Sequence, residues 1–239
     1  MKFTGLVSAA MAVATVLADA YPWTRLEKEK ALVLVVDLQE GLYNLARDWD
    51  PTLFKHQMIA HAAIGPVFGI PTILTTSAET GPNGQLPQEI FDLNPDATVV
   101  RRNGPINAWD DPAFREAVKA TGKTHIILAG IVTDVCTAFL ARSLRAEGYE
   151  VWANIEASGT TSEVIRSISN DQMLRAGVNV VSLFAIIGDI MRDWRSSPGA
   201  VELYPWLDKY FPVYGMMARA HTAAIRNGTI TEAAATLPN

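Results

Sequence analysis

Three side chains capable of chemistry stand at the ends of apolar stretches in this 239-residue chain. Asp37 directly follows the run Ala31 to Val36, Arg102 ends a short apolar segment, and Cys136, the only cysteine, comes shortly after the run Ile126 to Gly130. A thiolate is a nucleophile, a carboxylate can accept the thiol proton, and a guanidinium can stabilise negative charge and orient a substrate. If the fold brings the three together, they predict nucleophilic catalysis by cysteine.

Cys136 is expected in the first turn of a helix that begins where a core strand ends. In open α/β sheets, ligands bind at this edge. The positive end of the helix dipole and the unpaired backbone N–H groups favour a thiolate and can hold an oxyanion, so we expect the pKa of the thiol to be depressed. The alternative is an inert buried side chain, which is the commoner situation for a lone cysteine.

Asp37 and Arg102 have structural alternatives as well. An aspartate after a strand often caps a turn or a helix. Neighbouring residues of a strand point to opposite faces, so only one of Arg101 and Arg102 is expected to reach the site, and Arg102 is the nearer to the following loop. The alternative for both arginines is a solvated pair at the edge of the sheet.

The elements that must position these residues alternate between strand and helix. Short, continuous apolar runs predict buried parallel strands, and longer periodic segments predict helices. We expect strands over residues 31–36, 70–76, 98–102, 126–130, 150–154 and 178–182, and helices over 51–67, 112–118, 135–144, 162–176 and 183–194. This alternation predicts a single parallel sheet of about six strands with helices on both faces.

Two of these helices show a clear apolar face. Residues near a 3.6 spacing share one side of a helix, and that side is expected to meet the core. The residues on these faces are Val135, Phe139, Leu140 and Leu144 in one helix, and Val164, Ile168, Met173 and Leu174 in the other.

Composition, charge and the motifs present limit the classes of function that this chain could have. With 49% hydrophobic and 19% charged residues, the chain suits one large α/β domain. A net charge of -5 gives no electrostatic case for nucleic acid or an anionic membrane. The four histidines show no ligand grouping, which argues against a metal site. No glycine-rich dinucleotide fingerprint, Walker-type phosphate loop or G-x-S-x-G elbow is present, so neither a cofactor nor a serine hydrolase is expected.

The N-terminus has the pattern of a secretory leader. Lys2 precedes an apolar run that ends in a small-x-small cleavage pattern at Ala18 to Ala20. We therefore expect residues 1–20 to be a signal peptide and the mature protein to be secreted, with no membrane contact afterwards. The alternative is an apolar extension on a cytoplasmic protein. Asn227 begins a lone glycosylation sequon, which is a weak signal.

The C-terminal part is unusually aromatic. From Ser197 onward it contains Trp206, Tyr210, Phe211 and Tyr214. On a domain whose sheet is already complete, such a segment is expected to dock on the core or on a neighbouring subunit, and self-capping of the domain is the alternative. We divide the chain into the leader 1–20, a domain over 21–215 and a C-terminal tail over 216–239.

Four ordered motifs resemble the isochorismatase-like cysteine hydrolases, most closely their YcaC-type subgroup. They are Val35 to Gln39, Arg102 to Trp109, Gly130 to Cys136 and Glu156 to Thr160, and the resemblance covers about residues 28 to 215. The G-x-x-T-D-x-C segment at Gly130 is the most specific of them.

The resemblance implies a fold, a site and an assembly. The fold is a Rossmann-like, three-layer α/β fold with strand order 3-2-1-4-5-6. Asp37 would be the base, Arg102 the cation and Cys136 the nucleophile. A cis peptide between Ile131 and Val132 would turn the N–H groups of Val132 and Cys136 into an oxyanion hole. Proteins of this subgroup form large homo-oligomers.

Two departures from the wider family refine the expected reaction. Arg102 stands where lysine is usual, and it can hold an anion or the Asp37 carboxylate but is a poor proton shuttle. The loop 77–87 lacks the histidines of the metal-binding nicotinamidase branch. We therefore expect a metal-independent hydrolase of a small amide or related C–N substrate that works through a thioester acyl-enzyme.

The substrate pocket and the rival functions remain open at this point. Asn107 and Trp109 could line the pocket, and their alternative is loop structure and core packing. The rival function is a catalytically silent, homo-oligomeric binding or scaffold protein with the same fold. A thiol redox sensor is disfavoured because the chain has no resolving cysteine.

Overall fold

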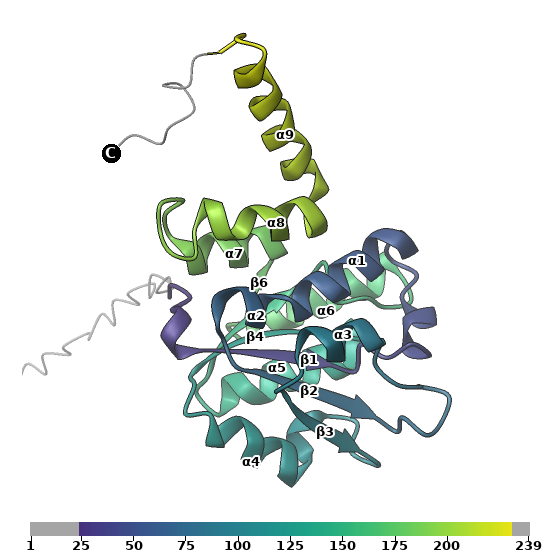
Figure 1. Cartoon of the computed structure of the whole chain (residues 1–239). Helices are drawn as coiled ribbons and strands as arrows, with labels where there is room; N and C mark the ends of the chain where they lie inside the picture. Colours follow the sequence, from purple (N-terminus) through teal and green to yellow (C-terminus); the bar gives the residue numbers. More distant parts are fainter. Residues whose placement is uncertain (1–23, 231–239) are drawn as a thin grey trace, which may run out of the picture.

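A six-stranded, all-parallel sheet forms the centre of the computed structural model, which describes residues 24–230 (Figure 1). The strand order is β3-β2-β1-β4-β5-β6, so the expected order 3-2-1-4-5-6 is confirmed. The strands are β1 (Ala31–Val36), β2 (Thr72–Ser77), β3 (Thr98–Arg102), β4 (His125–Gly130), β5 (Glu150–Asn154) and β6 (Asn179–Val181).

The two central strands explain why the sheet forms. Every residue of β1 and β4 is buried, as their continuous apolar sequences predict for strands covered on both faces. Val36 at the end of β1 pairs with Gly130 at the end of β4 and with Thr75 in β2. The chain segments that follow these strands therefore leave the sheet at one edge.

Helices cover both faces of the sheet. The α-helices are α1 (Pro51–Ala62), α2 (Ile64–Phe68), α3 (Gln88–Leu93), α4 (Pro112–Ala120), α5 (Ala138–Ala146), α6 (Glu163–Arg175), α7 (Leu183–Met191), α8 (Ala200–Tyr210) and α9 (Pro212–Arg226). Short 3-10 turns lie at Lys28–Lys30, Leu42–Leu45 and Ala108–Asp110, and a π-helical turn at Thr133–Thr137 precedes α5.

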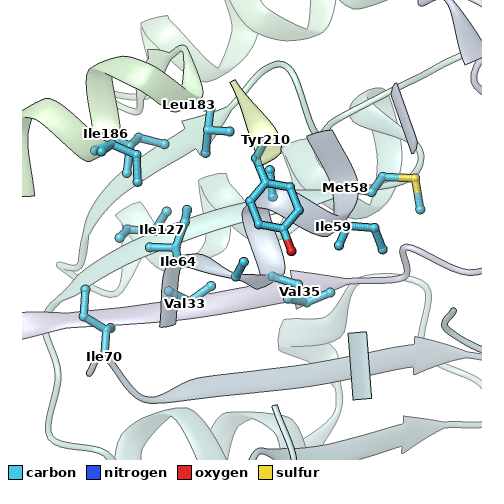
Figure 2. Packing of buried hydrophobic residues seen from close by; sticks show 14 of the residues in the cluster. Val33, Val35, Met58, Ile59, Ile64, Ile70, Ile127, Leu183, Ile186 and Tyr210 are labelled. Carbon is cyan, nitrogen blue, oxygen red and sulfur yellow. The ribbon is translucent and has the colours of Figure 1, made fainter. Parts of the chain in front are cut away.

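Side chains alternate along β1 between two hydrophobic clusters, which makes the expected three layers. Val33 and Val35 join the cluster formed with α1, α2, α7 and α8. Leu32 and Leu34 join the cluster formed with α4, α5 and α6. Figure 2 shows part of the first cluster, in which Tyr210 of α8 lies on the same side of the sheet as the two valines.

The two predicted apolar helix faces differ from the structure in part. Of the four residues predicted to form the apolar face of α6, only Met173 is buried, whereas Val164, Ile168 and Leu174 are 68%, 54% and 55% exposed. In α5, Phe139 is exposed while its helical neighbours are buried. Spacing shows which residues share a face of a helix, but the width of the strip that meets the core depends on what packs there.

The C-terminal helices form an arm with a docked part and a projecting part. Leu203, Trp206 and Leu207 of α8 are buried in the first cluster, so this part of the aromatic segment docks on the core. The helix α9 contacts α8 and then extends away from the body of the molecule (Figure 1). The expected boundary between residues 215 and 216 falls inside α9.

Two sequence expectations concern the ends of the chain. The expected signal peptide, residues 1–20, lies outside the described residues. Asn227 is exposed directly after the last residue of α9. Over residues 24–230, no helix is both long enough and apolar enough to cross a membrane.

Candidate active site

Asp37, Arg102 and Cys136 lie at the edge of the sheet where the strands end. Asp37 follows β1 directly, Arg102 is the last residue of β3, and Cys136 lies in the π-helical turn after β4. Because β2 separates β3 from β1, the Arg102 side chain reaches across β2 to pair with Asp37. Its neighbour Arg101 is exposed and pairs with Glu79 at 2.8 Å. The structure thus brings the three predicted residues together.

Arg102 is enclosed by hydrogen-bond acceptors. Its Nη2 donates to both carboxylate oxygens of Asp37. Its Nε donates to Thr75 Oγ1 at 2.9 Å. Its Nη1 donates to the carbonyl oxygens of Pro105 at 2.6 Å and Ile106 at 3.1 Å. All three guanidinium nitrogens therefore have partners within the protein.

Asp37 is held from its backbone as well as its side chain. Its backbone N–H donates to Thr75 O at 3.0 Å. Its φ of 54° is in the left-handed region, which aspartate visits more readily than most residues. Burial raises the pKa of the Asp37 carboxyl, and the neighbouring Arg102 charge opposes that rise. A buried carboxylate in this position is tolerated because it is paired and hydrogen-bonded.

The Asp37 carboxylate lies close enough to the Cys136 thiol to influence its pKa. Burial and the nearby negative charge of Asp37 together raise the pKa of the thiol, although the backbone N–H of Val132 favours the thiolate. The expected depressed pKa is therefore wrong. Desolvation outweighs the helix terminus, because Cys136 is only 9% exposed and sits inside the π-helical turn. This environment favours the protonated thiol over the thiolate, and the Asp37 carboxylate is the acidic group beside it.

The loop between β4 and the π-helical turn has the geometry that the resemblance implied. The peptide bond between Ile131 and Val132 is cis. Ile131 N donates to Val36 O at 3.3 Å, and Thr133 N donates to Gly159 O at 3.0 Å. These bonds tie the loop to the end of β1 and to the loop after β5, so the Val132 N–H is held beside the thiol.

Asn107 and Trp109 make structural contacts. Asn107 Oδ1 accepts a hydrogen bond from Trp109 N at 3.1 Å, and its Nδ2 donates to Ser143 Oγ at 3.0 Å. The Trp109 ring is 7% exposed and packs edge-on against Phe114 and Tyr149. These contacts are those of the alternative interpretation, loop structure and core packing.

Two residues of the site were missed by the sequence reasoning. Thr75 contacts both members of the ion pair, and Gln39 fixes the loop after β2. Gln39 Oε1 accepts from Ser77 N at 2.8 Å, and its Nε2 donates to Ser77 O at 3.1 Å. The available signal was a polar side chain inside a motif or a strand that is otherwise apolar, since such side chains must find partners.

Other hollows and clusters lie apart from this site. A cavity of about 500 Å³ lies between α1, α3 and α8, and its lining includes Lys55, His56, Glu89, Lys209 and Tyr210. In the described part of the chain, no group of three or more His, Cys, Asp and Glu side chains could hold a metal ion.

Known proteins are similar to this chain over most of its length. The isochorismatase domain family model matches residues 31–183. The chain is 46% identical over 175 residues to the probable hydrolase YcaC of Escherichia coli, which covers 73% of this chain and 84% of that protein.

Two solved structures are also similar. One is the Escherichia coli YcaC protein, described as an octameric hydrolase of unknown specificity, with 42% identity and a TM-score of 0.81. The other is YcaC from Pseudomonas aeruginosa with hexane-2,5-diol and covalent acrylamide, with 41% identity and a TM-score of 0.81. Each match covers 84% of this chain and 98% of the other chain.

Proposed function

Because this chain belongs to the isochorismatase family of hydrolases, we propose that it hydrolyses a small amide or related C–N substrate with Cys136 as the nucleophile. The observation that carries this proposal is the contact between the Cys136 thiol and the buried Asp37 carboxylate, which Arg102 holds in place. A protonated thiol beside a carboxylate can lose its proton at the moment of attack, so no preformed thiolate is required.

The first half of the reaction forms a thioester. Cys136 Sγ attacks the amide carbonyl carbon while Asp37 takes the thiol proton. The backbone N–H groups of Val132 and Cys136 hold the oxygen that becomes negative. Asp37 then gives its proton to the leaving nitrogen, and the C–N bond breaks to release the amine and leave an acyl group on sulfur.

The second half restores the thiol. Asp37 accepts a proton from a water molecule, and the water oxygen attacks the thioester carbonyl. The C–S bond breaks, the acid leaves, and the proton returns to sulfur. Over one turnover, amide and water become acid and amine, and the protein is unchanged.

A relative supports the amide class. The Pseudomonas aeruginosa protein carries a covalent acrylamide. Acrylamide is a small primary amide and also an alkylating agent for thiols, so a ligand of this chemical type reaches a reactive group in that protein.

An amide screen with ammonia release tests the proposal. Wild-type protein should release ammonia from at least one small amide, and Cys136→Ala should reduce that rate by ~10⁴-fold or more, as loss of a nucleophile does elsewhere. Thr222→Ala, an exposed change on α9, is the matched control and should leave the rate unchanged. Turnover that persists in Cys136→Ala would exclude the thiol mechanism.

The proposed working form is a homo-oligomer. The Escherichia coli relative is octameric. In this chain, Val213, Met216 and Met217 of α9 are 72%, 64% and 58% exposed, and α6 adds a second exposed apolar strip. Apolar surface of this kind is typical of contacts between subunits.

A further inference from the structure

If the proposed function holds, the surroundings of Arg102 also bear on the charge of the substrate. We propose that the site accepts uncharged acyl groups and rejects carboxylate-bearing ones, because Arg102 is a locked counter-charge for Asp37 and offers nothing to a substrate anion. A cation beside a nucleophile usually suggests an anion-binding site, so this assignment reverses the simple expectation.

The burial of the ion pair is the first support. The side chains of Arg102 and Asp37 are both 0% exposed. Cys136 keeps 9% exposure, so a substrate arriving at the edge of the sheet meets sulfur and not the guanidinium.

The hydrogen bonds of Arg102 are the second support. A guanidinium has five N–H groups, and Arg102 makes five hydrogen bonds to protein acceptors. Three of these acceptors, Asp37, Pro105 and Ile106, lie on the segments that follow β1 and β3, and the fourth is Thr75 on β2. A substrate carboxylate would have to displace one of them from a buried position, and a buried group left without its partner is costly.

The balance of charge is the third support. Asp37 and Arg102 together are neutral, and the thiol adds no charge while it is protonated. Arg101 faces away and pairs with Glu79. Asp134, in the same π-helical turn as Cys136, accepts a hydrogen bond from Thr160 Oγ1 at 2.6 Å. A substrate anion would therefore find neither Arg101 nor Arg102 free to pair with it, while a neutral amide needs no such partner.

Thr75 is the positioning residue that maintains this lock. Its Oγ1 accepts from Arg102 Nε and donates to Val100 O, each at 2.9 Å, and its carbonyl accepts from Asp37 N. One strand residue thus fixes both members of the ion pair. Thr75→Val keeps the shape of the side chain and removes the acceptor for Nε, whereas Thr75→Ser keeps that acceptor.

A matched pair of thiol reagents tests the inference. Iodoacetamide is neutral and iodoacetate is anionic, and they are otherwise nearly identical. Mass spectrometry measures the rate at which each reagent alkylates Cys136. The iodoacetamide rate is divided by the iodoacetate rate, and this quotient is compared with the quotient for free N-acetylcysteine. We expect the protein to favour iodoacetamide over iodoacetate by a further ~10-fold, which is about 1.4 kcal/mol.

The variants give the controls. Thr75→Val should lower this preference several-fold, and Thr75→Ser should retain it even if Thr75→Val folds poorly. Arg47, whose backbone N–H donates to Thr160 O at 2.7 Å, is another cation at this edge. Arg47→Gln should leave the preference unchanged.

The outcomes separate this inference from the proposed function. The inference is overturned if the protein shows the same rate ratio as the free thiol, or if it prefers iodoacetate. If the protein prefers iodoacetate and Arg47→Gln loses that preference, Arg47 is the responsible cation. Alkylation of Cys136 requires no turnover. A strong preference for iodoacetamide together with no amide hydrolysis would therefore contradict the proposed function but support the inference on substrate charge. No reaction of the folded protein with either reagent overturns both.

Discussion

The site at the edge of the sheet and the C-terminal arm both depart from the usual placement of charged residues at the surface and apolar residues in the core, but in opposite ways. In the site, Asp37 and Arg102 are charged and fully buried. In the arm, Val213 and Met216 are apolar and 72% and 64% exposed. Charged groups normally lie outside and large apolar groups inside, so each reversal needs a physical reason.

The reasons differ. The buried charges persist because each has a partner within the protein, and the partners come from three neighbouring strand ends. The exposed apolar groups of α9 have no comparable support within one subunit, because the helix contacts the rest of the molecule mainly through α8 (Figure 1). The charges of the first region have their partners within the chain, and the apolar side chains of the second remain at the surface of the single chain. The difference between the two regions can be tested by experiment.

Removing the cation should have the largest effect on folding. Arg102→Met leaves a buried carboxylate without its partner, and breaking a buried ion pair in this way costs about 3–5 kcal/mol. Urea unfolding followed by circular dichroism measures this. The double variant Asp37→Asn with Arg102→Met should recover part of the loss, because no unpaired charge remains. If Arg102→Met unfolds at the same urea concentration as wild type, the ion pair is not the structural element described above.

A second buried polar group should make stability depend on pH. His61 is fully buried, its Nε2 lies 3.0 Å from Leu34 O, and burial lowers its pKa to about 4. The His61 imidazole binds a proton near pH 6.5 in the unfolded chain but only near pH 4 in the folded chain. The free energy of unfolding is therefore highest above pH 6.5 and decreases as the pH falls toward 4.

The expected size of this loss is about 3 kcal/mol, at 1.36 kcal/mol for each unit of pKa shift. Unfolding free energies of wild type and His61→Gln, compared at pH 7 and at a pH near 4, isolate the contribution of this residue. The His61→Gln protein should lose less stability over that interval. Equal losses in the two proteins would show that His61 does not control the pH dependence.

Acid should also reduce the activity of the site. Burial raises the pKa of Asp37, and the base must be ionised to accept the thiol proton. The rate constant kcat/KM should therefore fall by about tenfold per pH unit below the raised pKa, and this acid limb should begin above the range of an ordinary carboxyl group. A profile that stays flat down to the ordinary carboxyl range would argue against Asp37 as the base.

Changes in the arm should affect assembly far more than folding. Met216→Lys places a charge on the exposed face of α9, and surface changes usually alter stability by no more than about 0.5 kcal/mol. Light scattering should nevertheless show a smaller particle. Thr222→Lys adds the same charge and serves as the control. Thr222 lies nine residues beyond Val213, which is about two and a half helical turns, so it is on the side of α9 opposite to Val213. Loss of assembly in the control alone would place the contact on the other face.

Local sequence was sufficient for most of the fold and for the positions of the candidate site residues. The runs at β1 and β4 are continuously apolar, so their burial and parallel pairing could be predicted. Asp37 and Cys136 follow these runs, and parallel strands end at one edge, so their meeting could be predicted too. The strand order came from the family resemblance of the motifs.

Several properties of the same residues were not accessible in this way. The direction of the thiol pKa depends on burial and on the distance to Asp37, which outweigh the local helix terminus. The partners of Arg102 come from residues up to 65 positions away in the chain. The apolar side chains of α6 are exposed because no other element that the structure describes covers them, and helical periodicity does not reveal which elements pack against a helix face.

The class of fold and the candidate thiol, carboxylate and guanidinium at one edge of the sheet could be inferred from the sequence. The direction of the thiol pKa, the pairing of Arg102 with Asp37 and the projection of α9 became visible only in three dimensions (Figure 1). The physical reason is that strand and helix patterns depend on neighbours along the chain, whereas desolvation and hydrogen-bond partners depend on neighbours in space.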